Sequence, residues 1–130
     1  MNNIIQVAEQ LYREANPTST MEPPSLVYEA IENRYNRWLL LTKEQKDAYD
    51  FLSYARILNS RNNLTKKQAK LCLEWGYRVS HKRFLKNEWI SQYKNDKNLY
   101  LDEHNNIIKK RNFWKYRQGS LIWETHYFII

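Results

Sequence analysis

Apolar residues recur every three to four positions through the first half of the chain, which is the spacing of an amphipathic helix. The pattern predicts helices over residues 2–15, 25–40 and 43–59. Residues 16–24 hold all three prolines and predict a linker. Thr42 and Gln45 have the spacing of a capping box, in which each side chain bonds the other residue's backbone amide. The first half is therefore expected to be helical.

The second half begins with the same arrangement and then changes its period. Thr65 and Gln68 predict another capping box and a helix that ends at Gly76. Ser80 is expected to cap a fifth helix, whose buried side would hold Leu85, Trp89, Ile90 and Tyr93. After Asn95 the apolar period moves from 3.6 toward 2, which is typical of strands.

Two hairpins follow from that change of period. Residues 98–111 predict two strands joined at Asn105 and Asn106, since asparagine tolerates the positive φ of a hairpin turn. Residues 113–117 and 121–130 predict a second pair of strands around Gln118 and Gly119. The expected fold is α+β, with about five helices followed by a small C-terminal antiparallel sheet of two hairpins. A length of 130 residues fits a single domain, with a helical scaffold over 1–60, a basic helical pair over 61–95 and hairpins over 96–130.

Charge divides the chain unevenly. Residues 1–60 hold six Lys and Arg against eight Asp and Glu, for a net charge of −2. Residues 61–130 hold fifteen against six, for a net charge of +9, and the whole chain carries +7. This asymmetry points to a polyanionic partner for the second half.

Several classes of site are excluded by composition. The two glycines, Gly76 and Gly119, are too far apart for a P-loop or a dinucleotide-binding fingerprint. Cys72 is the one cysteine, so an intrachain disulfide and a cysteine-based zinc site are excluded. We therefore expect no cofactor, no bound metal and no catalytic residue. The longest apolar runs are too short for a membrane span, which predicts a cytoplasmic protein without a membrane partner.

Residues 64–90 resemble a helix-turn-helix DNA-binding domain. Cys72 stands where that motif requires a small residue and Gly76 stands in the turn, whereas Lys82 departs from an aliphatic position. The resemblance implies that His81, Lys82, Arg83, Lys86 and Asn87 face the major groove or phosphates. Reversing the charges of Arg83 and Lys86 should then lower DNA affinity at least about tenfold. Two ordinary amphipathic helices with a solvated lysine face are the alternative.

The candidate contacts in this region are Lys66, Lys67, Lys70, Arg78, His81, Lys82, Arg83, Lys86 and Asn87. Residues 50–75 also resemble, loosely, the helical accessory regions of phage replication proteins. That resemblance covers about a fifth of the chain and implies DNA handling.

A second basic segment, KKRNFWKYR at residues 109–117, interleaves cations with aromatic residues. In a strand, its aromatic rings would stack on unpaired bases while its cations followed the backbone. The candidate contacts are Lys109, Lys110, Arg111, Trp114, Lys115 and Arg117. The alternative is an amphipathic strand whose aromatic residues belong to the core.

Histidines and carboxylates near the C-terminus form a third candidate site. Strand alternation would place Glu124 and His126 on one side, near Asp102 or His104 of the adjacent hairpin. A metal site or a nuclease acid–base pair is conceivable there, although none of the known spacings is present. His81 and Glu103 complete the set.

The sequence ends in four apolar residues, YFII, which need cover from the chain's own sheet, a partner or a homodimer formed through a C-terminal strand. The chain's own sheet is favoured. The leading hypothesis is a nucleic-acid-binding accessory protein of a phage or mobile element, with DNA favoured over RNA. The alternative is a phage-encoded inhibitor or adaptor that binds a host nuclease or defence complex. A small basic RNase toxin is third.

Overall fold

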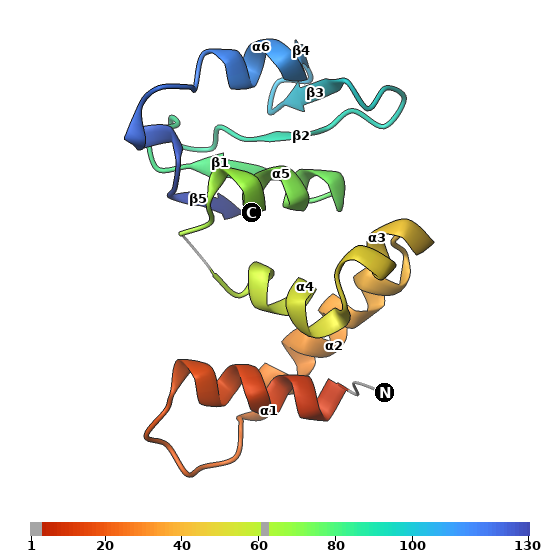
Figure 1. Ribbon diagram of the computed structural model, residues 1–130, viewed down its shortest axis with the longest axis vertical. Helices are drawn as coiled ribbons and strands as arrows, with labels where there is room; N and C mark the ends of the chain where they lie inside the picture. Colours follow the sequence, from red (N-terminus) through yellow and green to blue (C-terminus); the bar gives the residue numbers. More distant parts are fainter. Residues whose placement is uncertain (1–3, 61–62) are drawn as a thin grey trace. The chain divides into compact units, whose positions relative to one another are not determined.

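The computed structural model describes residues 4–60 and 63–130. It divides into two compact units, Met1–Asn59 and Ser60–Ile130 (Figure 1). The division falls at the position where the net charge of the sequence changes sign. None of the helices in the described ranges combines the length and apolar character needed to cross a bilayer.

The first unit is helical, as its apolar spacing predicts. It consists of α1 (Ile4–Ala15), α2 (Ser25–Leu39), α3 (Lys43–Ala48) and α4 (Phe51–Leu58). Helix α2 contacts both α1 and α4. The buried side chains of this unit are Val7, Ala8, Leu11, Ile31, Phe51, Tyr54, Ala55 and Leu58. The two predicted helices over 2–15 and 25–40 are confirmed within the described residues.

The single helix predicted over 43–59 is wrong, because the backbone leaves the helical region between α3 and α4. Tyr49 has φ −139° and ψ 115°, which is extended backbone. The Asp50 carboxylate then accepts a hydrogen bond from the Ser53 amide at 2.8 Å and caps α4. The apolar positions continue at helical spacing across this break, so periodicity alone does not show it. The Thr42 capping box is present as predicted.

Asp50 makes the stability of α4 depend on pH. Hydrogen bonds from Ser53 lower its pKa, and they outweigh the effect of partial burial. Since the folded pKa lies below the unfolded value of about 3.9, the stabilisation is complete above that value and is lost as the pH falls through the folded pKa. Asp50→Asn keeps a capping oxygen and removes the charge. We expect it to lower the free energy of unfolding at pH 7, by an amount that shrinks as the pH falls through the folded pKa of Asp50.

Urea unfolding followed by circular dichroism at several pH values measures this difference. Asp47→Asn is the matched control, because Asp47 lies on the exposed surface of α3 and pairs with Lys43 at 2.9 Å. An exposed pair of this kind contributes little to stability. A constant difference between Asp50→Asn and wild type from pH 7 to pH 3 would contradict the assigned role of the carboxylate.

The second unit opens with α5 (Lys66–Glu74), and both ends of this helix follow the sequence. Thr65 and Gln68 form the predicted capping box. At the other end, Gly76 has φ +89°, its amide donates to the Leu73 carbonyl, and the Tyr77 amide donates to the Cys72 carbonyl. This pair of bonds is a Schellman motif, which ends a helix and requires a residue that tolerates positive φ.

A five-stranded antiparallel sheet follows, in the order β4-β3-β2-β1-β5 (Figure 1). Its strands are β1 (Val79–His81), β2 (Ile90–Gln92), β3 (Leu99–Asp102), β4 (Ile107–Lys109) and β5 (Tyr127–Ile129). The predicted α+β class is confirmed, with one five-stranded sheet in place of two hairpins.

The fifth helix predicted from Ser80 is wrong, and the helix-turn-helix arrangement therefore lacks its second helix. Ser80 lies in β1 and its hydroxyl donates to the Glu88 carbonyl at 2.6 Å, so it does not cap a helix. Between the strands, Asn87 has φ +68°, which an α-helix does not accept. Leu85, expected on the buried side, is 79% exposed. The helical spacing of these apolar residues is coincidental.

The second predicted hairpin is also wrong. Residues expected as a strand form α6 (Lys110–Lys115), and a 3₁₀ turn η1 (Leu121–Trp123) precedes β5. Phe113 and Arg117 are four residues apart, and the Arg117 guanidinium bonds the Phe113 carbonyl at 2.9 Å. The helix and the turn that follows it bring Arg117 back beside Phe113 and Trp114, whereas a strand would place Trp114 on the opposite face from them.

The first predicted hairpin is confirmed, with β3 and β4 joined through Asn105. Asn105 has φ +63°, and the Asp102 amide donates to the Asn106 carbonyl. The connection, residues 103–106, is longer than the two-residue turn expected from the sequence. Asp102 stabilises it by accepting hydrogen bonds from His104 and Asn106. Burial raises the Asp102 pKa, but these hydrogen bonds lower it by more.

Helices α5 and α6 pack on the same face of the sheet. Side chains of that face, Ile90, Tyr100 and Tyr127, are buried together with Phe113 and Trp114 of α6 and the inner residues of α5. The β5 strand pairs with β1, and its Tyr127 also bridges to Leu64. The expectation that YFII belongs to the chain's own sheet is confirmed, and a homodimer through it stays a prediction.

Candidate nucleic-acid interface

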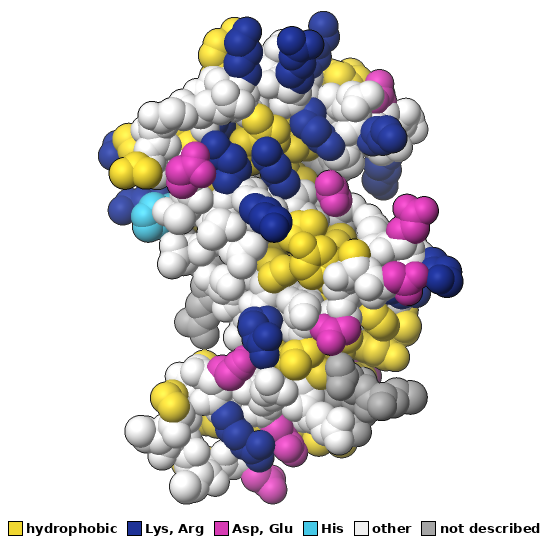
Figure 2. Space-filling view, viewed as in Figure 1, with side chains coloured by type: hydrophobic (Ala, Val, Ile, Leu, Met, Phe, Trp, Pro, Cys, Tyr) yellow, Lys and Arg dark blue, Asp and Glu magenta, His cyan; other side chains and the backbone are white. Residues whose placement is uncertain are grey.

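Four cations from α5, β4 and α6 line one groove of about 600 Å³ in the second unit. We call it the basic groove, and it is lined by Lys70, Glu74, Asn98, Leu99, Tyr100, Lys109, Lys110, Arg111 and Trp114. Figure 2 shows Lys and Arg side chains gathered around a hydrophobic patch over α5 and α6. Segments separated by about forty residues in sequence therefore combine into one positive surface.

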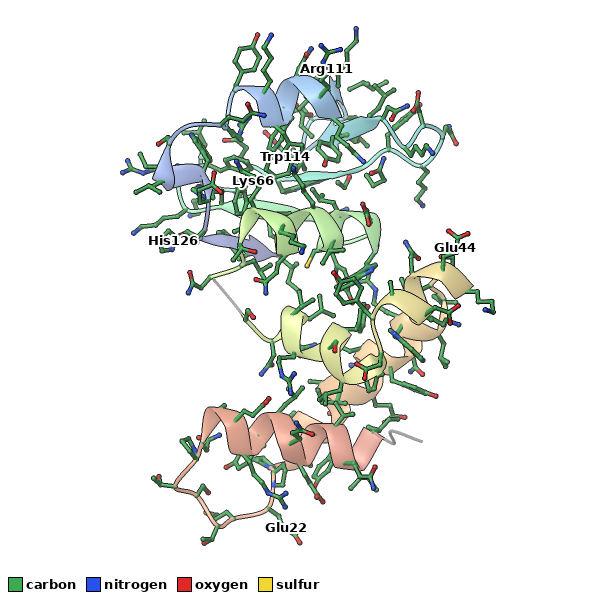
Figure 3. The ribbon with its side chains drawn as sticks, in the orientation of Figure 1. Glu22, Glu44, Lys66, Arg111, Trp114 and His126 are labelled. Atoms are coloured by element: carbon green, nitrogen blue, oxygen red, sulfur yellow. The ribbon has the colours of Figure 1, made fainter. Side chains whose placement is uncertain are left out.

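Two aromatic side chains form the floor of the basic groove. The Trp114 indole N–H donates to the Tyr100 hydroxyl at 2.7 Å, and both residues are buried. Burial raises the pKa of Tyr100 to about 12. Figure 3 shows Trp114 directed from α6 toward α5, with Arg111 at the outer surface of α6. Trp114 therefore belongs to the core, as the alternative interpretation of KKRNFWKYR holds, and it is not free to stack on a base.

Two of the four cations lie over these rings. The Lys70 ammonium is 5.0 Å from the centre of the Trp114 ring, and the Lys110 ammonium is 5.2 Å from that of Tyr100. Cation–π attraction at this range restrains long, flexible side chains. The core thus restrains two positive charges at the rim of the groove. Binding of an anion by these two side chains would cost little further side-chain entropy.

Glu74 is the one acidic residue among those that line the basic groove. The lining side chains therefore carry a net charge of +3. Helix α6 is fixed beside the groove by its first amide, since Lys110 donates to the Asn98 carbonyl at 2.9 Å. Asn98, Tyr100 and Glu74 are groove residues that the sequence interpretation missed. Asn98 and Tyr100 belong to the β3 segment and Glu74 ends α5, so only the packing of these elements brings them together, and no local pattern marks them.

The connection between β1 and β2 carries four more of the predicted contacts. Lys82, Arg83, Lys86 and Asn87 are all exposed, on turns rather than on a recognition helix. None of the four lines the basic groove. The structure therefore leaves them accessible but separates them from Lys70 and the α6 cations.

His81 is buried, which corrects its assignment as a contact to DNA. Its Nδ1 accepts a hydrogen bond from the Arg83 amide at 2.9 Å, so its Nε2, 2.8 Å from the Thr125 carbonyl, is the nitrogen that carries the proton. The ring packs against Phe84, Trp123 and Tyr127. Burial lowers the His81 pKa, and this favours the neutral ring.

Lys66 and Arg117 are also internal rather than ligand-facing. The Lys66 ammonium donates to the Arg117 carbonyl at 2.7 Å and to the Glu124 carboxylate at 2.9 Å. The Arg117 guanidinium lies 3.8 Å from the centre of the Phe113 ring and is also flanked by Phe84 and Trp123. Burial lowers the pKa of Arg117. Both cations hold the C-terminal segment in place.

The remaining predicted contacts lie on other parts of the second unit. Lys67 and Lys115 are exposed but do not line the basic groove. Arg78 is exposed, and its guanidinium lies 4.4 Å from the centre of the Trp89 ring. Lys70, Lys109, Lys110 and Arg111 are therefore the predicted cations that the fold brings together.

The histidine and carboxylate set does not converge. Glu124 and His126 precede β5 rather than alternating along a strand, and Glu124 pairs with Lys66. Asp102 is occupied by its turn, and His104 lies 3.6 Å from Glu103. Across residues 4–60 and 63–130, no three His, Cys, Asp or Glu side chains are placed to hold a metal ion.

Comparisons of this chain with protein-family models, curated proteins and solved structures find no match. The function is therefore inferred from the residues and geometry described above.

Proposed function

We propose that the second unit binds nucleic acid through phosphate contacts in the basic groove, and that the protein acts as an accessory factor of a phage or mobile element. The observation that carries this proposal is the convergence of Lys70, Lys109, Lys110 and Arg111 around one groove. Phosphates of a nucleic acid are spaced regularly, so a row of cations gains affinity from several of them at once.

The form of the groove favours a polymer over a small anion. Its four cations come from three elements, α5, β4 and α6, and a polyanion offers a separate phosphate to each of them. Lysine and arginine at a rim contact the backbone, which gives affinity without sequence selectivity. DNA stays the favoured partner, and the N-terminal unit would serve as a scaffold or docking surface.

Salt dependence tests the proposal directly. Fluorescence anisotropy would be measured for labelled single- and double-stranded DNA and RNA at about 50 and 200 mM salt. Four phosphate contacts predict that affinity falls by about 50-fold for a single strand and about 150-fold for a duplex across this range. Micromolar or tighter binding with such a fall supports the proposal.

Absence of binding at both salt concentrations would contradict it. The alternative, a basic inhibitor or adaptor that occupies a host protein, would then be tested by pull-down from the host. Cleavage of the labelled RNA during the titration would favour the ribonuclease hypothesis instead. The affinity, the salt slope and the integrity of the probe are read from the same samples.

A further inference from the structure

A second groove, of about 710 Å³, lies beside the open face of the sheet. We call it the sheet-face groove, and its lining includes Arg78, Trp89, Ser91, Tyr93, Lys94, Lys97 and Leu101. Three of these residues are cations and two are aromatic. The groove therefore combines the two side-chain types that recognise unpaired nucleotides.

The pairing register shows which face of the sheet this groove uses. Ser91 pairs with Leu101, and Leu101 pairs with Ile107, so these three share one face. Tyr100, which precedes Leu101 in β3, points to the opposite face of the sheet beneath α6. Ile107 is 55% exposed, which shows that no described helix covers its end of this face.

Arg78 and Trp89 form a cation–π pair in the sheet-face groove. The guanidinium is exposed and lies 4.4 Å from the ring centre. Unpaired bases stack on aromatic rings and on guanidinium planes, whereas paired bases within a duplex offer no free face. The pair is thus suited to an unpaired base, and its charge suits the adjoining phosphate.

The loop between β2 and β3 supplies the other cations. The Gln92 side-chain amide donates to the carbonyls of Tyr93, Asp96 and Leu99, which holds residues 93–98 in a compact turn. Lys94 and Lys97 are exposed on that turn. The backbone that carries these two lysines is therefore held by Gln92.

The two grooves meet at the end of α5. Glu74 lines both of them, and the neighbouring residues Lys97 and Asn98 line one groove each. A ligand that occupies both must turn around this edge of the sheet. Duplex DNA is stiff over about 150 base pairs, whereas a single strand bends freely at each nucleotide.

We infer that the ligand is a single strand of DNA or RNA, with its phosphates in the basic groove and an unpaired base stacked at Arg78 and Trp89. This inference rests on the proposed function and adds the strand type and a second contact site. Base stacking and phosphate contacts are available from both DNA and RNA. The experiment therefore uses a single-stranded probe of each kind to distinguish them.

The test compares 12-nucleotide oligo(dT), 12-nucleotide oligo(U) and a 12-base-pair DNA duplex by fluorescence anisotropy at about 50 mM salt. We expect at least one single strand to bind about tenfold tighter than the duplex. Arg78→Ala should lower single-strand affinity about tenfold, since one base stack contributes a factor of that order. The same change should alter duplex affinity less than threefold.

Arg83→Ala is the matched control, because Arg83 is an exposed arginine of the same unit that lines neither groove. It should lower single-strand affinity less than threefold. Arg78→Lys keeps the positive charge and loses the planar guanidinium. It should therefore retain the wild-type salt slope but lose most of the single-strand affinity that Arg78→Ala loses. Unchanged thermal melting of each variant shows that its fold is intact.

Equal effects of Arg78→Ala and Arg83→Ala, with equal affinity for single strand and duplex, would overturn the inference while leaving the basic groove as a phosphate site. If the proposed function itself is wrong, neither the wild-type protein nor any variant would bind any of the three probes.

Discussion

Replacing Lys109 and Arg111 together by glutamate is expected to lower the affinity for nucleic acid at least about 30-fold at 50 mM salt. Each removed phosphate contact weakens binding and lowers the salt slope by about one unit, and each new carboxylate repels the backbone. Both side chains are exposed, so their loss leaves the core intact. Negative charge in the first turn of α6 is also favourable to the helix. The protein should therefore remain folded.

The matched control is the double replacement of Arg83 and Lys86 by glutamate, which changes the net charge by the same amount. These residues lie on the exposed turns between β1 and β2 and line neither groove. The structure predicts a loss of about threefold or less, through long-range repulsion alone. The helix-turn-helix resemblance predicts at least about tenfold for the same variant.

Anisotropy titrations of both variants at two salt concentrations separate these expectations. A larger loss for the Arg83 and Lys86 variant than for the Lys109 and Arg111 variant would move the interface from the basic groove to the β1–β2 connection. Equal losses would indicate a diffuse electrostatic surface with no preferred groove.

Trp114→Ala is expected to reduce the free energy of unfolding of the second unit by about 3–5 kcal/mol. The indole is 6% exposed, packs edge-on against Phe113 with 4.8 Å between ring centres and also meets Tyr127. Its removal leaves a cavity between α5, α6 and the sheet and deprives the Tyr100 hydroxyl of its donor. Such a loss is a large part of the stability of a small unit.

Two further variants separate packing from hydrogen bonding in urea unfolding. Trp114→Phe keeps an aromatic ring but loses the indole N–H, so we expect an intermediate loss of about 1–3 kcal/mol. Tyr116→Ala is the control, because Tyr116 is 77% exposed at the end of the same helix and should change stability by less than about 0.5 kcal/mol. Equal stability of Trp114→Ala and wild type would restore the stacking role that the sequence suggested for this residue.

The basic groove and the core beneath it are coupled, because two of the groove cations lie over buried aromatic rings. Lys70 and Lys110 lie over the rings of Trp114 and Tyr100. Mutation of the floor is therefore expected to weaken binding as well as folding, whereas mutation of the exposed rim weakens binding alone.

Local signals in the sequence were sufficient for the features that depend on neighbouring residues. The capping boxes at Thr42 and Thr65 are present, and Gly76 ends α5. The β3–β4 hairpin forms around Asn105. In each case the atoms that bond lie within five residues of one another, so their spacing in the chain fixes their spacing in the fold.

Two segments took the opposite secondary structure from the one their spacing favours. Residues 79–92 form β1, a turn and β2 because β5 and β3 pair with them on either side. Residues 110–115 form a helix because Phe113 and Trp114 are then buried against Tyr100, and Arg117 lies against the rings of Phe113 and Phe84. Short apolar runs fit either period, and distant partners decide between them.

The sequence by itself determined the α+β class, the helix caps, the first hairpin and the concentration of positive charge after residue 60, since each depends on local spacing or on composition. Only the tertiary structure decided which cations work together. It buried His81, paired Lys66 with Glu124, placed Arg117 among aromatic rings and brought Lys70 to the cations of α6. The physical reason is that a charged side chain serves the fold or a ligand according to its burial and neighbours, and strand pairing sets both.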